Sequence, residues 1–180
     1  TIEPIRKAFP AAKVGGPASC WIDNQPPPGL VERCKATGTP LDFISWHLYS
    51  DDPERHASGV EKAKALLAGF PGNRPEMMVT EWSCGFDRIS VEELAFDSRR
   101  AAITAATLIA FRDAGLDWSF YYHLWDQVCY PESFRPFFSQ KGVDNMVQHW
   151  NEIPHRFGLF GVNEEARPQY FVYRMWERLG

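Results

Sequence analysis

Four short stretches of the chain are almost continuously apolar, and each ends in polar or aromatic residues. They cover residues 12–19, 41–49, 76–84 and 117–125. They show little of the alternation between apolar and polar residues that marks a strand with one solvated face. Apolar runs of this length are typical of parallel strands that are buried on both faces. The pattern therefore predicts four strands of a parallel sheet.

Between these stretches, and after the last one, apolar residues recur at three- and four-residue steps. Such spacing places apolar side chains on one face of a helix. It predicts helices over residues 29–35, 59–70 and 97–114, the third beginning at a capping-type Asp97. A last helix is predicted from Pro168, which suits a first-turn position, to Gly180. The order along the chain is strand then helix, four times over.

The spacing of the strands favours a barrel. The predicted starts lie 29, 35 and 41 residues apart, and a closed barrel of eight units averages about 31 residues per unit. A four-stranded doubly wound sheet is the competing architecture, but Gly15-Gly16-Pro17 lacks the spacing of its phosphate-binding loop. We therefore predict that residues 1–180 form one partial domain, half of a (β/α)8 barrel.

Composition narrows the class of protein. Of 180 residues, 44% are hydrophobic and 23% are charged, as expected of a folded domain. A net charge of −4 gives no reason to expect a nucleic-acid partner, and no apolar run approaches the ~20 residues of a membrane span. The four cysteines form no C-x-x-C pair, so a structural zinc site is not expected. They are free thiols or form up to two disulfides.

The candidate chemistry lies at the ends of the predicted strands. Glu81 stands in an apolar strand end, where a carboxylate is costly unless it is paired or functional. A buried ion pair and an active-site role are both open at this point. Alternation places His47 and Tyr49 on one face of the second strand, and His123 and Trp125 on one face of the fourth. Three strand ends thus bring polar and aromatic groups to one rim.

Carboxylate, imidazole, phenol and indole groups around one cleft suit a sugar, because aromatic rings stack on its apolar faces and polar groups bind its hydroxyls. The predicted partner is therefore an oligosaccharide or glycoside. A metal site at His47, His123 and Asp126 is specified by no spacing. A Ser-His-Asp hydrolase would need a G-x-S-x-G turn, which the sequence lacks. Neither a metal nor a cofactor is expected.

The strings KVGGPAS, DFISWHLYS and VTEWS, followed by a strand ending in Trp, together resemble the second half of a clan A glycoside hydrolase. The nearest resemblance is to glycoside hydrolase family 39, the β-xylosidase and α-L-iduronidase group. The later strings FGLF and RPQY resemble the end of those barrels, and the likeness runs from about Lys13 to the end of the chain. It implies that the chain is the C-terminal half, strands five to eight, of a (β/α)8 TIM barrel.

The resemblance also implies an activity and its residues. A retaining glycoside hydrolase of this type cleaves β-xyloside-like or related bonds by double displacement. Glu81 matches the catalytic nucleophile, and His47 and Tyr49 match a pair that contacts the nucleophile and the substrate. Trp125 matches a tryptophan that floors the sugar subsite. Trp82 and His123 are expected to shape the same pocket.

One part of the family pattern is missing. The general acid/base is a Glu in an Asn-Glu motif at the end of strand four, which would lie upstream of Thr1. Retaining hydrolysis needs a second carboxyl about 5–5.5 Å from the nucleophile, and we do not expect it among Asp23, Asp51 and Asp126. The alternative is a non-catalytic carbohydrate-binding or assembly protein. A half barrel exposes two sheet edges, so a homodimer is expected if the chain is naturally this short.

Overall fold

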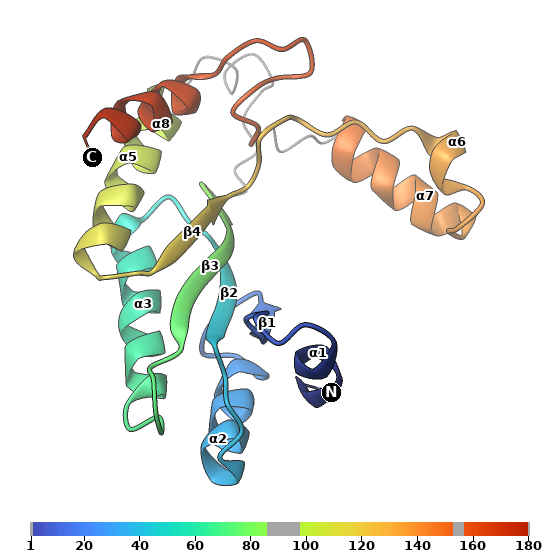
Figure 1. The fold of residues 1–180 in the computed structure, drawn as a ribbon. Coiled ribbons are helices and arrows are strands. Elements are labelled where there is room, and N and C mark those ends of the chain that lie inside the picture. Colours follow the sequence, from blue (N-terminus) through green and yellow to red (C-terminus); the bar gives the residue numbers. More distant parts are fainter. Residues whose placement is uncertain (1, 86–97, 153–156, 180) are drawn as a thin grey trace. The chain divides into compact units, whose positions relative to one another are not determined.

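The computed structural model describes residues 2–85, 98–152 and 157–179. The helices and strands, in chain order, are α1 (Ile2–Ala8), β1 (Gly15–Ser19), α2 (Pro27–Thr37), β2 (Phe43–Tyr49), α3 (Pro53–Leu67), β3 (Glu76–Ser83), α5 (Ser98–Asp113), β4 (Trp118–Tyr121), α6 (Pro131–Phe134), α7 (Gln140–Val147), a π-helix η1 (Gln148–Glu152) and α8 (Pro168–Arg178) (Figure 1). All four predicted strands and four predicted helices are present. The fourth strand ends at Tyr121, short of the predicted end at Trp125. Asp97, the predicted cap of α5, lies outside the described residues.

The strands form one sheet in the order β1-β2-β3-β4. β1 pairs with β2 in parallel, and β3 pairs with β4 in parallel. The spatial order equals the chain order, with helices between successive strands, as in consecutive units of a (β/α)8 barrel. A doubly wound sheet instead reverses its strand order at a switch point. The architecture is therefore that of a partial TIM barrel, as predicted.

The chain divides into two compact units. The first contains residues 1–82 and 106–121, and the second contains residues 83–105 and 122–180. The first unit holds α1 to α3, nearly all of the sheet and the second half of α5. The second unit holds the first half of α5 and everything after β4. That residues 1–180 form one partial domain stays a prediction.

The core of the first unit lies on the face of the sheet that α3 and α5 cover. The side chain of Asp52 accepts a hydrogen bond from the backbone N–H of Glu54 at 3.0 Å and caps the start of α3. The helix then buries Val60, Ala63 and Leu67, whose spacing puts them on one face. His56 of α3 and Phe111 of α5 both pack edge-on against Trp82 of β3, with ring centroids 5.8 and 5.3 Å away.

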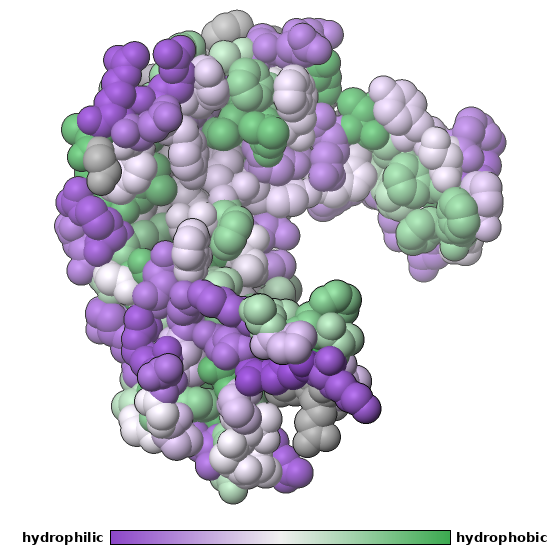
Figure 2. All heavy atoms as spheres, viewed as in Figure 1, coloured by the Kyte–Doolittle hydropathy of each residue, from purple (hydrophilic) through white to green (hydrophobic). Residues whose placement is uncertain are grey.

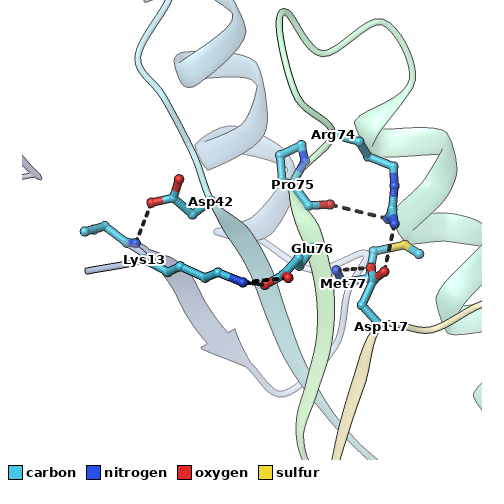
Figure 3. A network of polar contacts seen from close by, with 8 residues as sticks. Lys13, Asp42, Arg74, Pro75, Glu76, Met77 and Asp117 are labelled. Carbon is cyan, nitrogen blue, oxygen red and sulfur yellow. Dashed lines mark hydrogen bonds and ion pairs between the residues drawn. The ribbon is translucent and has the colours of Figure 1, made fainter. Parts of the chain in front are cut away.

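Carboxylates at the N-terminal ends of the strands bind residues of other strand starts (Figure 3). Asp42, just before β2, accepts a hydrogen bond from the backbone N–H of Val14 at 2.7 Å. Asp117, just before β4, accepts one from Met77 of β3 at 2.8 Å and also binds Arg74 at 2.8 Å. Glu76 binds Lys13 at 2.7 Å. Because each aspartate bonds the backbone at the start of the preceding strand, it fixes the register of that pair.

The segment that follows β4 contains α6, α7 and η1. Apolar side chains gather over the α6–α7 segment (Figure 2). Phe137 and Phe138 are exposed there, and the Phe138 ring packs edge-on to Phe134 at 6.0 Å. No helix among the described residues is both long and apolar enough to cross a bilayer. The cysteines all fall in the described part of the chain, and none forms a disulfide; only Cys20 is exposed.

Candidate active site

The carboxyl ends of β2 and β3 bring Glu81 and Tyr49 together in the first unit. The Tyr49 hydroxyl donates a hydrogen bond to Oε1 of Glu81. The Glu81 side chain is 30% exposed, so its carboxylate is open to solvent while one of its oxygens is held. The two residues lie 32 positions apart in the sequence, and the sheet makes them neighbours. The structure therefore confirms that the ends of these two strands meet.

His47 faces the other oxygen of the same carboxylate. Its Nδ1 lies 3.7 Å from Oε2 of Glu81, and its side chain is 24% exposed. His47 and Tyr49 are two residues apart in β2 and so share a face of the strand, as the alternation predicted. Their neighbours Trp46 and Leu48 are buried on the opposite face. The Glu81 carboxylate is thus held by a phenol of β2, and an imidazole of the same strand lies near its second oxygen.

An irregularity in β3 turns Glu81 toward these partners. Met77 and Val79 are buried, and strict alternation would place Glu81 on that buried face with them. The register against β4 shifts between Val79 and Trp82. A β-bulge of this kind re-aims the side chains that follow it. Glu81 is consequently half-buried beside Tyr49. Trp82, instead of Glu81, points into the core on the face of Met77 and Val79.

Trp82 does not join this cluster. Its side chain is 1% exposed, and its ring packs edge-on to His56, Phe111 and Tyr121 at centroid distances of 5.1 to 5.8 Å. The expectation that Trp82 shapes a sugar pocket is therefore corrected, because its indole fills the core under α3 and α5. Neighbouring residues of a strand point to opposite faces, so a site role for Glu81 already indicated that Trp82 points away from the site, and this was the unused signal.

The other two predicted site residues lie in the second unit. The Trp125 ring is 46% exposed and stacks on Phe160, with centroids 5.0 Å apart and ring planes 28° apart. The His123 ring stacks on Tyr122 at 4.2 Å, and its side chain is mostly buried. The backbone N–H of Leu159 donates to His123 O at 2.9 Å, and that of Phe160 donates to Leu124 O at 2.9 Å. Both residues are thus placed by the segment of residues 157–160. Their part in sugar binding stays a prediction.

Asp126 has a structural role that the sequence analysis missed. It is buried, its Oδ2 binds the guanidinium of Arg167, and its Oδ1 accepts a hydrogen bond from the backbone N–H of Gly158 at 2.9 Å. Arg167 is also buried, so the pair joins the segment after β4 to the start of α8. A buried charge needs such a partner. The position of Arg167 directly before a helix-starting Pro168 was the available signal.

Two of the other candidate carboxylates are engaged elsewhere. Asp126 pairs with Arg167, and Asp23 forms an ion pair with Lys62 at 2.6 Å. The hydrogen bond from Lys62 holds the pKa of Asp23 below its ordinary value. Within the described residues no group of three His, Cys, Asp or Glu side chains is arranged to hold a metal ion. The clearest chemical group of the first unit is therefore Glu81 with Tyr49 and His47.

This cluster can support nucleophilic chemistry. A partly exposed carboxylate at the carboxyl end of a parallel strand stands where barrel enzymes place their catalytic groups. The hydrogen bond from Tyr49 limits rotation of the carboxylate. A fixed carboxylate loses less freedom when it attacks a bound electrophile. The other possibility raised from the sequence was an ion pair between Glu81 and a buried Lys or Arg. Among the described residues Glu81 forms no such pair, and its neighbours are Tyr49 and His47.

Comparison with known proteins gives the family context. No family model matches the chain. A curated beta-xylosidase of Caldicellulosiruptor saccharolyticus is 26% identical over 194 residues, which cover 97% of this chain and 34% of that protein. A beta-xylosidase of Geobacillus stearothermophilus is 20% identical over 198 residues, 100% of this chain and 36% of that protein. The chain therefore spans about a third of the length of the curated relatives it matches.

Solved structures share its fold. The GH39 enzyme from Xanthomonas axonopodis pv. citri matches with a TM-score of 0.67 at 18% identity, over 98% of this chain and 34% of that one. A glucosidase from Croceicoccus marinus matches with a TM-score of 0.66 at 21% identity, over 98% of this chain and 33% of that one. These matches confirm the predicted resemblance: the chain has the fold of part of a family 39 barrel.

Proposed function

We propose that this chain carries the nucleophile of a retaining glycoside hydrolase that acts on β-xyloside-like bonds, and that Glu81 is this nucleophile. The observation that carries the proposal is the half-exposed Glu81 carboxylate, held by the Tyr49 hydroxyl and faced by His47. The names of the two curated relatives support the substrate class. Trp125 is proposed to offer its exposed ring to the sugar.

The proposed reaction has two steps. In the first, a Glu81 oxygen bonds to the anomeric carbon while the bond to the leaving oxygen breaks, and that oxygen takes a proton from a general acid. In the second, water gives its proton to the same group and displaces Glu81 from the sugar. We assign the acid/base to a carboxyl group outside residues 1–180. Tyr49 and His47 then orient the carboxylate during both steps.

A fluorinated sugar with an activated leaving group tests whether Glu81 is the nucleophile, because this leaving group needs no general acid to protonate it. With 2,4-dinitrophenyl 2-deoxy-2-fluoro-β-xyloside, the dinitrophenolate leaves unprotonated, and the fluorine slows hydrolysis of the covalent intermediate. We expect the protein to gain one fluoroxylosyl group, which peptide mass mapping locates on Glu81. Glu81→Gln should abolish the labelling.

Glu76→Gln is the matched control, since Glu76 lies on the same strand but binds Lys13 at the opposite end. It should label like the wild type. Labelling that persists in Glu81→Gln, or that maps to another residue, would remove Glu81 from the mechanism. A folded protein that is not labelled at all would also overturn the proposal.

A second candidate function is carbohydrate binding without catalysis. It is favoured by the exposed Trp125 ring, which Phe160 supports from one side. Calorimetry with xylotriose distinguishes the two functions. Binding that Trp125→Ala removes, together with the absence of labelling at Glu81, would establish the second candidate over the first. Labelling at Glu81 would reject it.

A further inference from the structure

His56, near the start of α3, is a polar ring in the core of the first unit. Its side chain is fully buried, and its ring packs edge-on to Phe111 of α5 with centroids 5.3 Å apart. Its Nδ1 has no hydrogen-bond partner in the described part of the chain. A buried polar atom without a partner costs free energy, which an apolar side chain of similar size would avoid. Packing alone therefore does not explain an imidazole at this position.

The imidazole provides one hydrogen bond that an apolar side chain could not. Its Nε2 lies 3.1 Å from the carbonyl oxygen of Ser50. Because a carbonyl can only accept, Nε2 carries the proton and Nδ1 does not. Burial lowers the pKa of His56 below its ordinary value of 6.5, so the ring stays neutral at pH 7. His56 is therefore a fixed donor to the backbone of Ser50.

Ser50 connects this bond to the candidate active site. It follows Tyr49, the last residue of β2, so its backbone lies just beyond the strand. Its hydroxyl accepts a hydrogen bond from the backbone N–H of Asp52 at 3.1 Å. The hydroxyl and the carbonyl of Ser50 are thus both held from the start of α3. The chain is restrained directly after the tyrosine that binds Glu81.

The same imidazole also contacts the residue after Glu81. Its ring centroid lies 5.8 Å from that of Trp82, with the ring planes 72° apart. Trp82 is almost fully buried, and Phe111 packs on it at 5.3 Å, so the indole is fixed. His56 thus touches the residue that follows each partner of the hydrogen bond between Tyr49 and Glu81. A shift of one strand end against the other would worsen the geometry of that bond, and hydrogen bonds weaken steeply as their geometry worsens.

We propose that His56 is a positioning residue for the Tyr49–Glu81 hydrogen bond. Its donated bond to the Ser50 carbonyl holds the end of β2 against the end of β3, where the imidazole rests on Trp82. His56 acts on Glu81 through the backbone and through Tyr49. Its role in catalysis rests on the proposed function, since it adds a residue to the same site. The geometry itself can be measured without any reaction.

Two variants separate the donated bond from the filling of the core. His56→Gln keeps a donor, because its side-chain amide reaches about as far as Nε2 does. His56→Met has a flexible chain of similar length that fills the space without donating. Both lose the edge-on contacts of the ring, so a difference between them reports the bond to Ser50. Urea unfolding at pH 7 establishes that each variant is folded before it is used.

The ζ carbon of Tyr49 reports the geometry. In protein with ¹³C-labelled tyrosine, the peak that disappears in Tyr49→Phe belongs to this residue, and Glu81→Gln gives its position without the carboxylate. We expect His56→Met to move the peak more than half of the way to that position. His56→Gln should leave it close to the wild-type position. His149→Met, at an exposed histidine of η1, is the matched control and should not move it.

Labelling of Glu81 by the fluorinated xyloside gives the second readout. His56→Met should slow it by no more than Tyr49→Phe does, and His56→Gln should label close to the wild-type rate. In the Tyr49→Phe background, where the hydrogen bond is already lost, His56→Met should cause no further loss. Effects that pass through one shared bond do not add, whereas a general loosening of the core would lower the rate in both backgrounds.

Several results would overturn the proposal. They are a Tyr49 peak that keeps its wild-type position in folded His56→Met, an equal movement of the peak in His56→Gln, and additive losses of rate. Nitrogen NMR of the wild type adds a test that does not depend on the folding of His56→Met: a proton on Nδ1 of His56 instead of Nε2 would also overturn the proposal. If the peak moves as expected but the wild type is not labelled, the positioning role is supported and the proposed function fails.

Discussion

The Tyr49 hydroxyl donates a hydrogen bond to Glu81 Oε1, and this contact joins the ends of two neighbouring strands. It holds the carboxylate through one oxygen while His47 faces the other at 3.7 Å. The orientation of Glu81 therefore depends on the register of β2 against β3 as well as on the side chains themselves.

Tyr49→Phe should slow labelling of Glu81 by the fluorinated xyloside. The variant loses the hydrogen bond that holds the carboxylate, and a bond to a charged group is worth about 1.5–3 kcal/mol. This energy sets an upper limit of about a hundredfold on the loss of rate, because only the part of the bond that is stronger in the transition state affects the rate. Mass spectrometry over time measures the rate. Tyr130→Phe, which changes an exposed tyrosine of the second unit, is the control and should label at the wild-type rate. An unchanged rate in Tyr49→Phe would show that the hydroxyl does not position Glu81.

His56 should make the first unit less stable in mild acid. Burial lowers the pKa of its imidazole below the ordinary 6.5, although Nε2 donates to the Ser50 carbonyl at 3.1 Å. The unfolded chain therefore binds the proton more readily than the folded one, and stability falls as pH drops below about 6.5. Urea unfolding between pH 7 and 5 should show this slope.

His56→Gln should flatten that slope, because glutamine does not titrate and its amide can still donate to Ser50. His149→Gln is the matched control, since His149 is exposed on η1, and it should keep the slope of the wild type. A wild-type slope in His56→Gln would assign the acid sensitivity to another group.

Asp117→Asn should destabilise the protein at neutral pH by about 1.5 kcal/mol, the value of a hydrogen bond to a charged group. Burial alone would raise the pKa of Asp117, but the bonds from Arg74 and from the Met77 N–H outweigh it and hold the pKa below 3.8. A carboxylate with a lowered pKa contributes stability above about pH 3.8, and the contribution is lost as pH falls through the folded pKa.

The difference between wild type and Asp117→Asn should accordingly shrink below pH 3.8, as measured by urea unfolding. Asp113→Asn provides the control, because Asp113 is exposed and its ion-pair partner in the described part of the chain is its neighbour Arg112. It should change the free energy of unfolding by less than about 0.5 kcal/mol. If the two proteins differed in free energy of unfolding by the same amount at all pH values, the charge of the Asp117 carboxylate would not be the source of the stabilisation.

Arg167→Met should cost about 3–5 kcal/mol, because it leaves the buried Asp126 carboxylate without its guanidinium. The double variant Asp126→Leu/Arg167→Met should be more stable than the single one, since no charge is then left buried. Guanidinium unfolding, followed in the second unit, measures both. Arg174→Met, an exposed residue of α8, serves as the control. A double variant less stable than Arg167→Met would contradict this account.

Much of the fold follows from local patterns in the sequence. The apolar runs located all four strands, and the helical spacing located α2, α3, α5 and α8. The barrel architecture followed from the strand spacing and from the missing phosphate-binding loop, together with the family resemblance. The helices α1, α6 and α7 were not predicted, because they are short and their apolar residues form no long periodic stripe. A repeated Leu-Asp-aromatic string, at Leu41 and at Leu116, was the unused signal for the aspartates that join the strands.

The sequence by itself determined which chemical groups stand at the strand ends: Glu81, His47 and Tyr49 follow from their places in apolar runs. The resemblance implied that they meet, and only the tertiary structure shows through which contacts. The pairing of β2 with β3 brings Tyr49 to Glu81, and the shift in β3 sends Trp82 into the core instead. The physical reason lies in the alternation of side chains. In a regular strand, successive side chains point to opposite faces, and the sequence pattern shows this. At a bulge the side chains that follow change face, and the bulge depends on how the strand pairs with its neighbour.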